Sequence, residues 1–188
     1  MKFSTRDIIL GAMFAALAVV AALILRFLGG LVVPFSLLPF VAVLAGAMLG
    51  GRLGAMSMLV YVLMGLVGLP VFEKPPYGGP AYVLQPTFGF LLGFIAGAYV
   101  TGKLLPAGGK AGLVRYIAAT LAGVVVIYLV GLPYLYMILN FYLGKTFSAL
   151  AVIKMGFIPF IGADIVKAII ASALARAVAR RVRAARIL

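Results

Sequence analysis

The chain has 188 residues, of which 66% are hydrophobic and 10% are charged, and its formal net charge is +13 at pH 7. A soluble domain of this length would need many more charged residues on its surface. The composition therefore indicates one integral membrane domain over residues 1–188. Cysteine and histidine are both absent, which excludes a disulfide framework, a thiol nucleophile, an imidazole base and a Cys/His metal site, and we expect no resident cofactor.

The N-terminal segment is basic and then apolar, like a secretory signal peptide. Its apolar run is long and many further runs follow, so we expect an uncleaved first membrane helix. A long fifth segment contains Pro133, which should kink it or begin an outer extension. The pattern predicts an all-α membrane protein with six transmembrane helices, at about 8–28, 35–50, 53–69, 86–105, from 112 onward, and 156–178.

The distribution of basic residues predicts the orientation of these helices. If the N-terminus lies inside, eleven lysines and arginines fall at inner ends and four at outer ends. The positive-inside rule then places both termini in the cytoplasm, and the excess positive charge is explained by this bias and by anionic lipid rather than by nucleic acid. The connections 29–35, 70–86 and 140–156 would face outside, which suggests that the protein acts on something outside.

One aspartate and one lysine interrupt the last apolar segment, at Asp164 and Lys167. Residues three apart share a helix face, and a charged side chain at the centre of a membrane helix costs about 2.5–3.5 kcal/mol on insertion scales. Both side chains should therefore point toward protein or a water-filled cavity. The segment begins near 156–159 at its outer end, so the pair lies in the outer half of the membrane.

Two interpretations of the pair are open: an ion pair that only neutralises itself, or a polar anchor in an outward-facing pocket. We favour the pocket, because two apolar residues would pack there without the cost of desolvation and intramembrane ionisable residues are by default functional. Aspartate accepts bonds from a urea, amide or amine, and lysine donates to a carbonyl or carboxylate. The implied ligand is small, partly apolar and polar at both ends.

Other chemistry has little support. The GKT of residues 144–146 lacks the earlier glycine of a P-loop, so the chain cannot energise uptake by itself. Of the three carboxylates, Asp7 suits the N-terminus of the first helix, and Glu73 is expected to be solvated beside Lys74. No catalytic residues, metal site or enzymatic activity are therefore expected. A small proton-coupled secondary carrier that uses the Asp–Lys pair as a relay stays an alternative.

Three stretches carry a specific combination of motifs: VPFSLLPFVAVLAGAMLGGRLGAMSMLVY at 33–61, GLPVFEKPPYGGPAYVLQPTFGFLLGF at 68–94 and GFIPFIGADIVKAI at 156–169. Together they resemble the BioY family, the biotin-specific membrane component of energy-coupling factor (ECF) transporters, and they cover most of the chain. The resemblance implies an S-component-type bundle of six helices in a prokaryotic plasma membrane. It would capture biotin outside and dock on a transmembrane coupling protein driven by two cytosolic ATPases. An S component for another vitamin is the alternative within this group.

The resemblance also implies a biotin site. It places Asp164 on the ureido N–H groups of biotin and Lys167 on the ureido oxygen or the carboxylate. The family's T-L-Q is replaced here by Ser36, Leu37 and Leu38, so a glutamine is missing. Gln85 or Asn140 is the candidate for supplying that amide. The remaining residues expected at the site are Tyr82, Thr87 and Ser36.

Small residues in the first helix form a second functional candidate. Helices in lipid associate where small residues let their backbones approach closely. Related S components use such residues to dock on the coupling protein, which implies a docking face made of Gly11, Ala12, Ala15 and Ala16. Packing inside the protein is the alternative for this face. The glycine stripes at 89, 93 and 97 and at 46, 50 and 54 are expected mostly to pack internally.

Overall fold

The computed structural model describes residues 4–27, 36–106 and 111–185, and within these ranges its regular secondary structure is helical. The elements are α1 (Thr5–Phe27), α2 (Leu38–Leu49), α3 (Gly51–Leu66), the 3₁₀ helix η1 (Pro80–Leu84), α4 (Phe88–Leu104), α5 (Leu113–Met137), the π-helical turn η2 (Ile138–Tyr142), α6 (Ala149–Gly156) and α7 (Ile158–Ala185).

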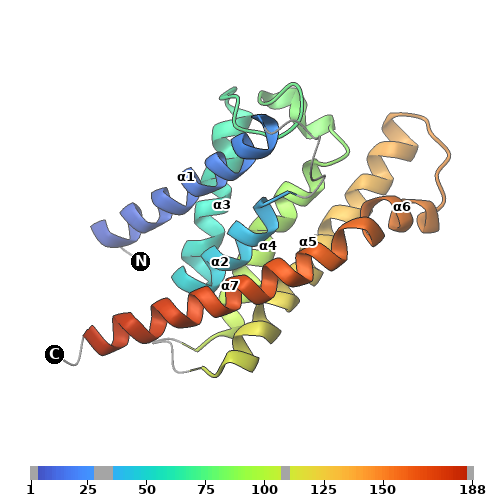
Figure 1. Cartoon of the computed structure of the whole chain (residues 1–188). Helices are drawn as coiled ribbons and strands as arrows, with labels where there is room; N and C mark the ends of the chain where they lie inside the picture. Colours follow the sequence, from blue (N-terminus) through green and yellow to red (C-terminus); the bar gives the residue numbers. More distant parts are fainter. Residues whose placement is uncertain (1–3, 28–35, 107–110, 186–188) are drawn as a thin grey trace.

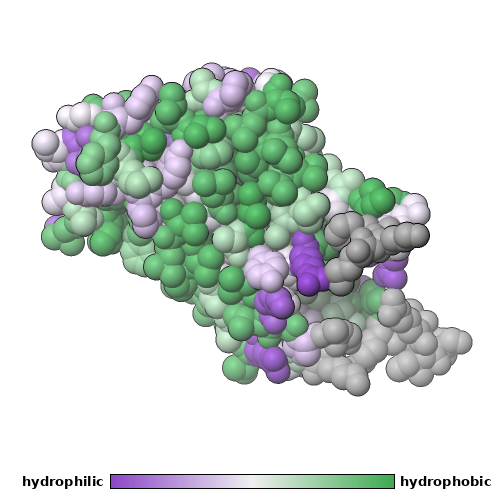
Figure 2. Space-filling view, turned by 180° about the vertical axis from the view of Figure 1, so that it is seen from behind, coloured by the Kyte–Doolittle hydropathy of each residue, from purple (hydrophilic) through white to green (hydrophobic). Residues whose placement is uncertain are grey.

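The long helices run between the two ends of an elongated bundle (Figure 1). Both chain ends lie at one end of the bundle, together with the α2–α3 turn and the lower ends of α4 and α5. The 67–87 connection and α6 lie at the other end. The opposite view shows apolar side chains over most of the surface, with hydrophilic residues gathered toward the end that holds the chain termini (Figure 2). The bundle therefore has a largely apolar outer surface and two ends that differ in hydrophilicity.

Three helices of the described ranges are long and apolar enough to cross a membrane, namely Thr5–Phe27, the continuous Leu113–Tyr142 and Ile158–Val182. Three shorter apolar helices, α2, α3 and α4, have 12, 16 and 17 residues. These six correspond in position to the six predicted segments. The all-helical class is confirmed, and α2, α3 and α4 are shorter than a standard membrane span of about 20 residues.

Glycines bring the backbones of the central helices into contact. A Cβ atom on Gly46 of α2 would lie 2.2 Å from the carbonyl oxygen of Ala98 on α4. One on Gly93 of α4 would lie 2.7 Å from that of Ile127 on α5, and one on Gly97 2.8 Å from that of Gly123. Most of both glycine stripes therefore packs inside the protein, as predicted, because only a residue without a side chain allows this approach. Gly50 differs, since a Cβ atom there would meet nothing within 4 Å.

Helix α7 lies against α5 and α2 through equally small residues. Ala168 and Ala171 are fully buried, and the hydroxyls of Thr120 on α5 and Ser172 on α7 lie 2.7 Å apart. Both hydroxyls also donate to or lie within hydrogen-bond distance of the carbonyl oxygen of Ala168. This close contact fixes α7 against the bundle and determines where the first turns of α7 place their side chains.

The predicted outer connection 140–156 is wrong in part, because residues 149–156 form helix α6. Its N-terminus is capped by Ser148, whose hydroxyl accepts from the amide of Ala151 at 3.2 Å, and a serine before an apolar run is a typical helix start. Helix α5 continues past Pro133 and ends in the π-helical turn η2. The expected connection 29–35 lies outside the described residues.

Candidate ligand-binding site

The first turns of α7 place Asp164 and Lys167 toward the protein interior. The Lys167 ammonium forms an ion pair with Oδ1 of Asp164, and their side chains are 14% and 7% exposed, respectively. Both side chains are thus largely enclosed by protein, which is one of the two surroundings predicted for them. Two opposite charges in so enclosed a place require further hydrogen-bond partners, since an incompletely satisfied buried pair is costly.

Tyr128 of α5 supplies one of these partners. Its hydroxyl donates to Oδ2 of Asp164 at 2.5 Å, so both carboxylate oxygens are occupied. The Tyr128 ring meets Phe157 edge-on at a centroid distance of 4.8 Å, and Phe90 at 6.0 Å. Sequence reasoning missed Tyr128. The available signal was a tyrosine within an apolar helix, whose buried hydroxyl needs a partner.

Ser36 supplies the second partner. The Lys167 Nζ donates to the backbone carbonyl oxygen of Ser36 at 2.6 Å, and the Ser36 hydroxyl donates to Oε1 of Glu73 at 2.6 Å. A continuous polar chain, which we call the site chain, therefore runs from Tyr128 through Asp164, Lys167 and Ser36 to Glu73. It joins α5, α7, the entry to α2 and the α3–α4 connection.

The expectation that Glu73 is solvated is wrong. The side chain is partly buried and is bonded by Ser36 rather than left to solvent. Burial raises the pKa of this carboxyl above its usual value of 4.5, while the Ser36 hydrogen bond and the charges of Lys74 and Lys167 act in the opposite direction. The sequence offered no local signal for this, because the contact depends on how the α3–α4 connection folds back over the bundle.

The other predicted site residues lie near the α3–α4 connection or in a separate segment. Tyr82 is 3% exposed and its ring lies 4.2 Å from that of Phe72. Gln85 and Thr87 are partly buried between η1 and α4. Asn140 uses its side chain locally, donating to the Tyr136 carbonyl and accepting from the Phe147 amide. The structure therefore joins Ser36, Asp164 and Lys167 directly, and gives Asn140 a different set of partners.

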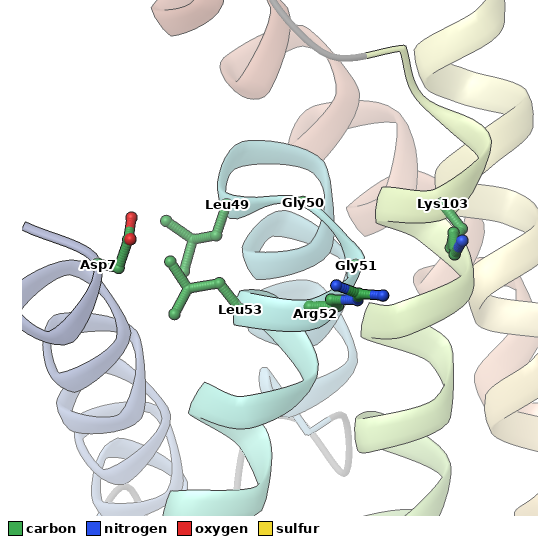
Figure 3. Close-up of a pocket in the computed structure, with 7 residues that line it drawn as sticks. All are labelled: Asp7, Leu49, Gly50, Gly51, Arg52, Leu53 and Lys103. Carbon is green, nitrogen blue, oxygen red and sulfur yellow. The ribbon is translucent and has the colours of Figure 1, made fainter. Parts of the chain in front are cut away.

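Two of the hollows on the surface of the described residues are lined by neither Asp164 nor Lys167. One, of about 610 Å³, is an apolar groove between α5 and the α6–α7 pair, and it shares Tyr128 and Phe157 with the surroundings of the site chain. The other, of about 380 Å³, has a mixed polar and apolar lining and lies at the α2–α3 turn, with Asp7 on one side and Arg52 and Lys103 on the other (Figure 3).

The structure divides the proposed docking face of α1. Gly11 and Ala15 are buried, and a Cβ atom on Gly11 would lie 3.3 Å from the Leu53 side chain of α3. Ala12 and Ala16 are exposed. Bulkier apolar side chains flank these two alanines on the exposed side of the helix. These flanking residues are Ile8, Ile9, Met13, Leu17 and Val20. Two of the four small residues are thus available to a partner.

Over the ranges that the structure describes, no group of three or more acidic, histidine or cysteine side chains could hold a metal ion. The site chain consists of hydrogen-bonding groups of several kinds. It offers carboxylate oxygens, an ammonium, a phenol and a hydroxyl within one enclosed region.

Comparison with known proteins gives a consistent family. The BioY family model matches residues 1–184. A probable biotin transporter BioY of Lysinibacillus sphaericus is 43% identical over 183 residues, covering 97% of this chain and 91% of that protein. The biotin transporter BioY of Rhizobium etli is 39% identical over 183 residues, covering 93% and 94%. That of Thermotoga maritima is 39% identical over 170 residues, covering 90% and 94%.

A solved structure shows the same fold. The crystal structure of the S-component for biotin from an ECF-type ABC transporter superimposes with a TM-score of 0.75, covering 95% of each chain at 22% identity. Because the identity is low, this match concerns the arrangement of helices. It agrees with the bundle described above.

Proposed function

This chain belongs to the BioY family, and from that premise we propose that it captures biotin and serves as the substrate-binding component of an ECF transporter. Relatives that cover nearly the whole chain are named as biotin transporters. The family is one of transporters, so no enzymatic reaction is assigned.

The observation that carries the proposal is the site chain. Asp164 is an acceptor for the two N–H groups of a ureido ring, and Lys167 is a donor for the ureido oxygen or the carboxylate of biotin. Each already has a protein partner that holds it in place, Tyr128 for Asp164 and Ser36 for Lys167. Such pre-oriented groups bind a ligand with less loss of side-chain entropy than free ones.

The remaining contacts are proposed from position. Tyr82, Gln85 and Thr87 lie at the junction of the α3–α4 connection with α4, where they would cover the ligand. Asn140 would need to exchange its local partners in order to contribute, so Gln85 is the better candidate for the amide absent at Leu38. The enclosing aromatic surface comes from Phe72, Tyr82, Phe88 and Phe157.

We also propose the orientation and the partners. Both termini would face the cytoplasm of a prokaryotic cell, with six helices in the plasma membrane and the Ser36–Glu73 end outside. Basic residues at the ends of α3, α4 and α7 favour this choice. Ala12 and Ala16 would meet a transmembrane coupling protein, and two cytosolic ATPases would drive transport, since the chain has no P-loop of its own.

The test is biotin binding by the purified protein without ATP. Isothermal titration in detergent should give a saturable heat, and unlabelled biotin should displace labelled biotin. If neither a heat signal nor displacement is observed, the assignment of biotin as the ligand is wrong. A thermal-shift screen with several vitamins and over a range of pH distinguishes the remaining possibilities. Stabilisation by another vitamin would indicate an S component for that vitamin, and stabilisation by no vitamin would favour a proton-coupled carrier.

A further inference from the structure

The segment that carries Glu73 is anchored in the bundle by its neighbour. Phe72 is fully buried, and its ring lies 5.8 Å from Tyr61 and 4.2 Å from Tyr82. A Cβ atom on Gly65 of α3 would come within 2.0 Å of the Phe72 ring, so the ring fills the space that this glycine leaves. Because Phe72 cannot shift without opening the bundle, the backbone of Glu73 is held in one position.

A second anchor comes from α1. The Arg26 guanidinium donates to the carbonyl oxygen of Pro70 at 3.2 Å and lies 3.7 Å from the centre of the Tyr77 ring. The Phe72 amide also donates to the Tyr77 carbonyl at 2.8 Å, which closes the turn between them. The segment from Pro70 to Tyr77 is thus fixed on both sides of Glu73.

Ser36 connects Glu73 with the ligand site. Its hydroxyl donates to Glu73, accepts from the Leu38 amide at 3.1 Å, and its carbonyl oxygen accepts from Lys167. The hydroxyl and the carbonyl are parts of the same residue. The hydrogen bond from the Ser36 hydroxyl to Glu73 therefore helps to keep the Ser36 carbonyl oxygen oriented toward Lys167. The Leu38 side chain, which is apolar and 2% exposed, contributes nothing polar beyond its backbone amide.

The charged groups around Glu73 also connect it with Lys167. The charged and titratable groups that face its carboxyl are Lys74 on its own segment, Lys167 of α7, and the phenols of Tyr61 on α3 and Tyr82 on η1. Lys167 therefore experiences two carboxylates, Asp164 by direct contact and Glu73 through Ser36.

We propose that Glu73 is a positioning residue of the ligand site, which acts through Ser36 to hold Lys167 in the orientation that binds the ligand. The inference rests on the proposed function. Glu73 need not touch the ligand, and it supplies a polar group at the entry to α2, near the position where the family's glutamine is replaced by Leu38. Removing it should weaken ligand binding and leave the fold intact.

The experiment is a double-mutant cycle on biotin affinity in purified protein. E73A and S36A should each weaken binding about three- to tenfold, the range that one hydrogen bond typically contributes. The double variant should be no weaker than either single variant, because both remove the same connection. E73Q, which keeps an oxygen for Ser36 but loses the charge, should fall between E73A and the wild type. K74A, an exposed neighbour on the same segment, should bind like the wild type.

The pH profile provides a readout that loss of structure would not imitate. The biotin affinity of the wild type should fall more steeply toward acid than that of E73Q, since only the wild type can protonate residue 73. Additive effects of E73A and S36A, affinities equal to that of K74A, or identical pH profiles would each overturn the inference. If the wild type itself does not bind biotin, the failure belongs to the proposed function instead.

Discussion

The ammonium of Lys167 and the backbone carbonyl oxygen of Ser36 lie 2.6 Å apart, although 131 residues separate them in the sequence. This contact joins the last helix of the bundle to the beginning of α2. The side chain of Ser36 continues the connection to Glu73 and so to the α3–α4 connection. The candidate site therefore needs residues from Ser36 to Lys167 to come together, and no short segment of the chain contains it.

Replacement of Asp164 by asparagine should weaken biotin binding by about 100-fold or more, equivalent to about 2.7 kcal/mol. The amide presents one N–H₂ donor to ligand groups that are themselves donors, and it leaves Lys167 without its direct counter-ion. Isothermal titration checks this. The matched control is D7N, since Asp7 lies in the first turn of α1 and has Ser4, outside the site chain, as its partner. Wild-type affinity in D164N would show that the anchor is misplaced.

Removal of the Tyr128 hydroxyl should have a smaller effect on the same measurement. Y128F keeps the ring against Phe157 but leaves Oδ2 of Asp164 without its donor. We expect biotin affinity to fall about three- to tenfold, as for one hydrogen bond to a charged group. Y99F removes a hydroxyl from a half-exposed tyrosine of α4 and should bind normally. Equal affinities for both variants would remove Tyr128 from the site.

The two sides of α1 should separate docking from folding. A12L places a bulky side chain on the exposed side and should leave biotin affinity and Tm unchanged, while uptake by cells and copurification with the coupling protein decrease. A15L places the same change at a buried position, 2% exposed, and should lower Tm through overpacking. Unimpaired uptake by A12L would exclude this face as the docking surface.

The close approach of α4 and α5 predicts a strong dependence on glycine. G97A should lower Tm, because its Cβ atom would lie 2.8 Å from the carbonyl oxygen of Gly123, and such overpacking typically costs about 1–3 kcal/mol. G162A is the control on α7, where a Cβ atom meets nothing within 4 Å. It should be neutral or slightly stabilising, since alanine favours a helix over glycine. Thermal unfolding in detergent distinguishes the two, and an unchanged Tm for G97A would contradict the packing described.

The raised pKa of Glu73 predicts a pH-dependent contribution to stability. A raised pKa means that the folded protein binds this proton more tightly than the unfolded chain does. The favourable contribution is complete below the unfolded value near 4.5 and is lost as the pH rises through the higher folded value. E73Q cannot ionise, so its Tm relative to the wild type should increase from acidic to neutral pH. A constant difference in Tm across that range would argue against a buried carboxyl.

The sequence was sufficient for features that depend on local spacing. Asp164 and Lys167 are three residues apart on a helix, so their pairing follows from helix geometry. The segment pattern likewise located six of the seven α-helices in the described ranges, with their beginnings within a few residues of those observed. The resemblance to a known family supplied the fold and the ligand, which composition and periodicity alone left open.

Features that depend on tertiary contact were missed. Tyr128 and Glu73 join the site from other elements, 36 residues before Asp164 and 37 residues after Ser36, and no local pattern marks either contact. Glu73 stands beside Lys74 in the sequence, which suggested a solvated pair, whereas the fold directs its side chain to Ser36. Helix α6 was overlooked because its eight residues are too few for a membrane segment.

The glycine contacts of α4 also limit how this protein can change shape. Where one backbone rests directly on another, no side-chain rotamers are available to absorb a sliding motion between helices. We therefore expect α2, α4 and α5 to move together as one rigid body. Deformation during a transport cycle is then left to the elements outside this rigid body.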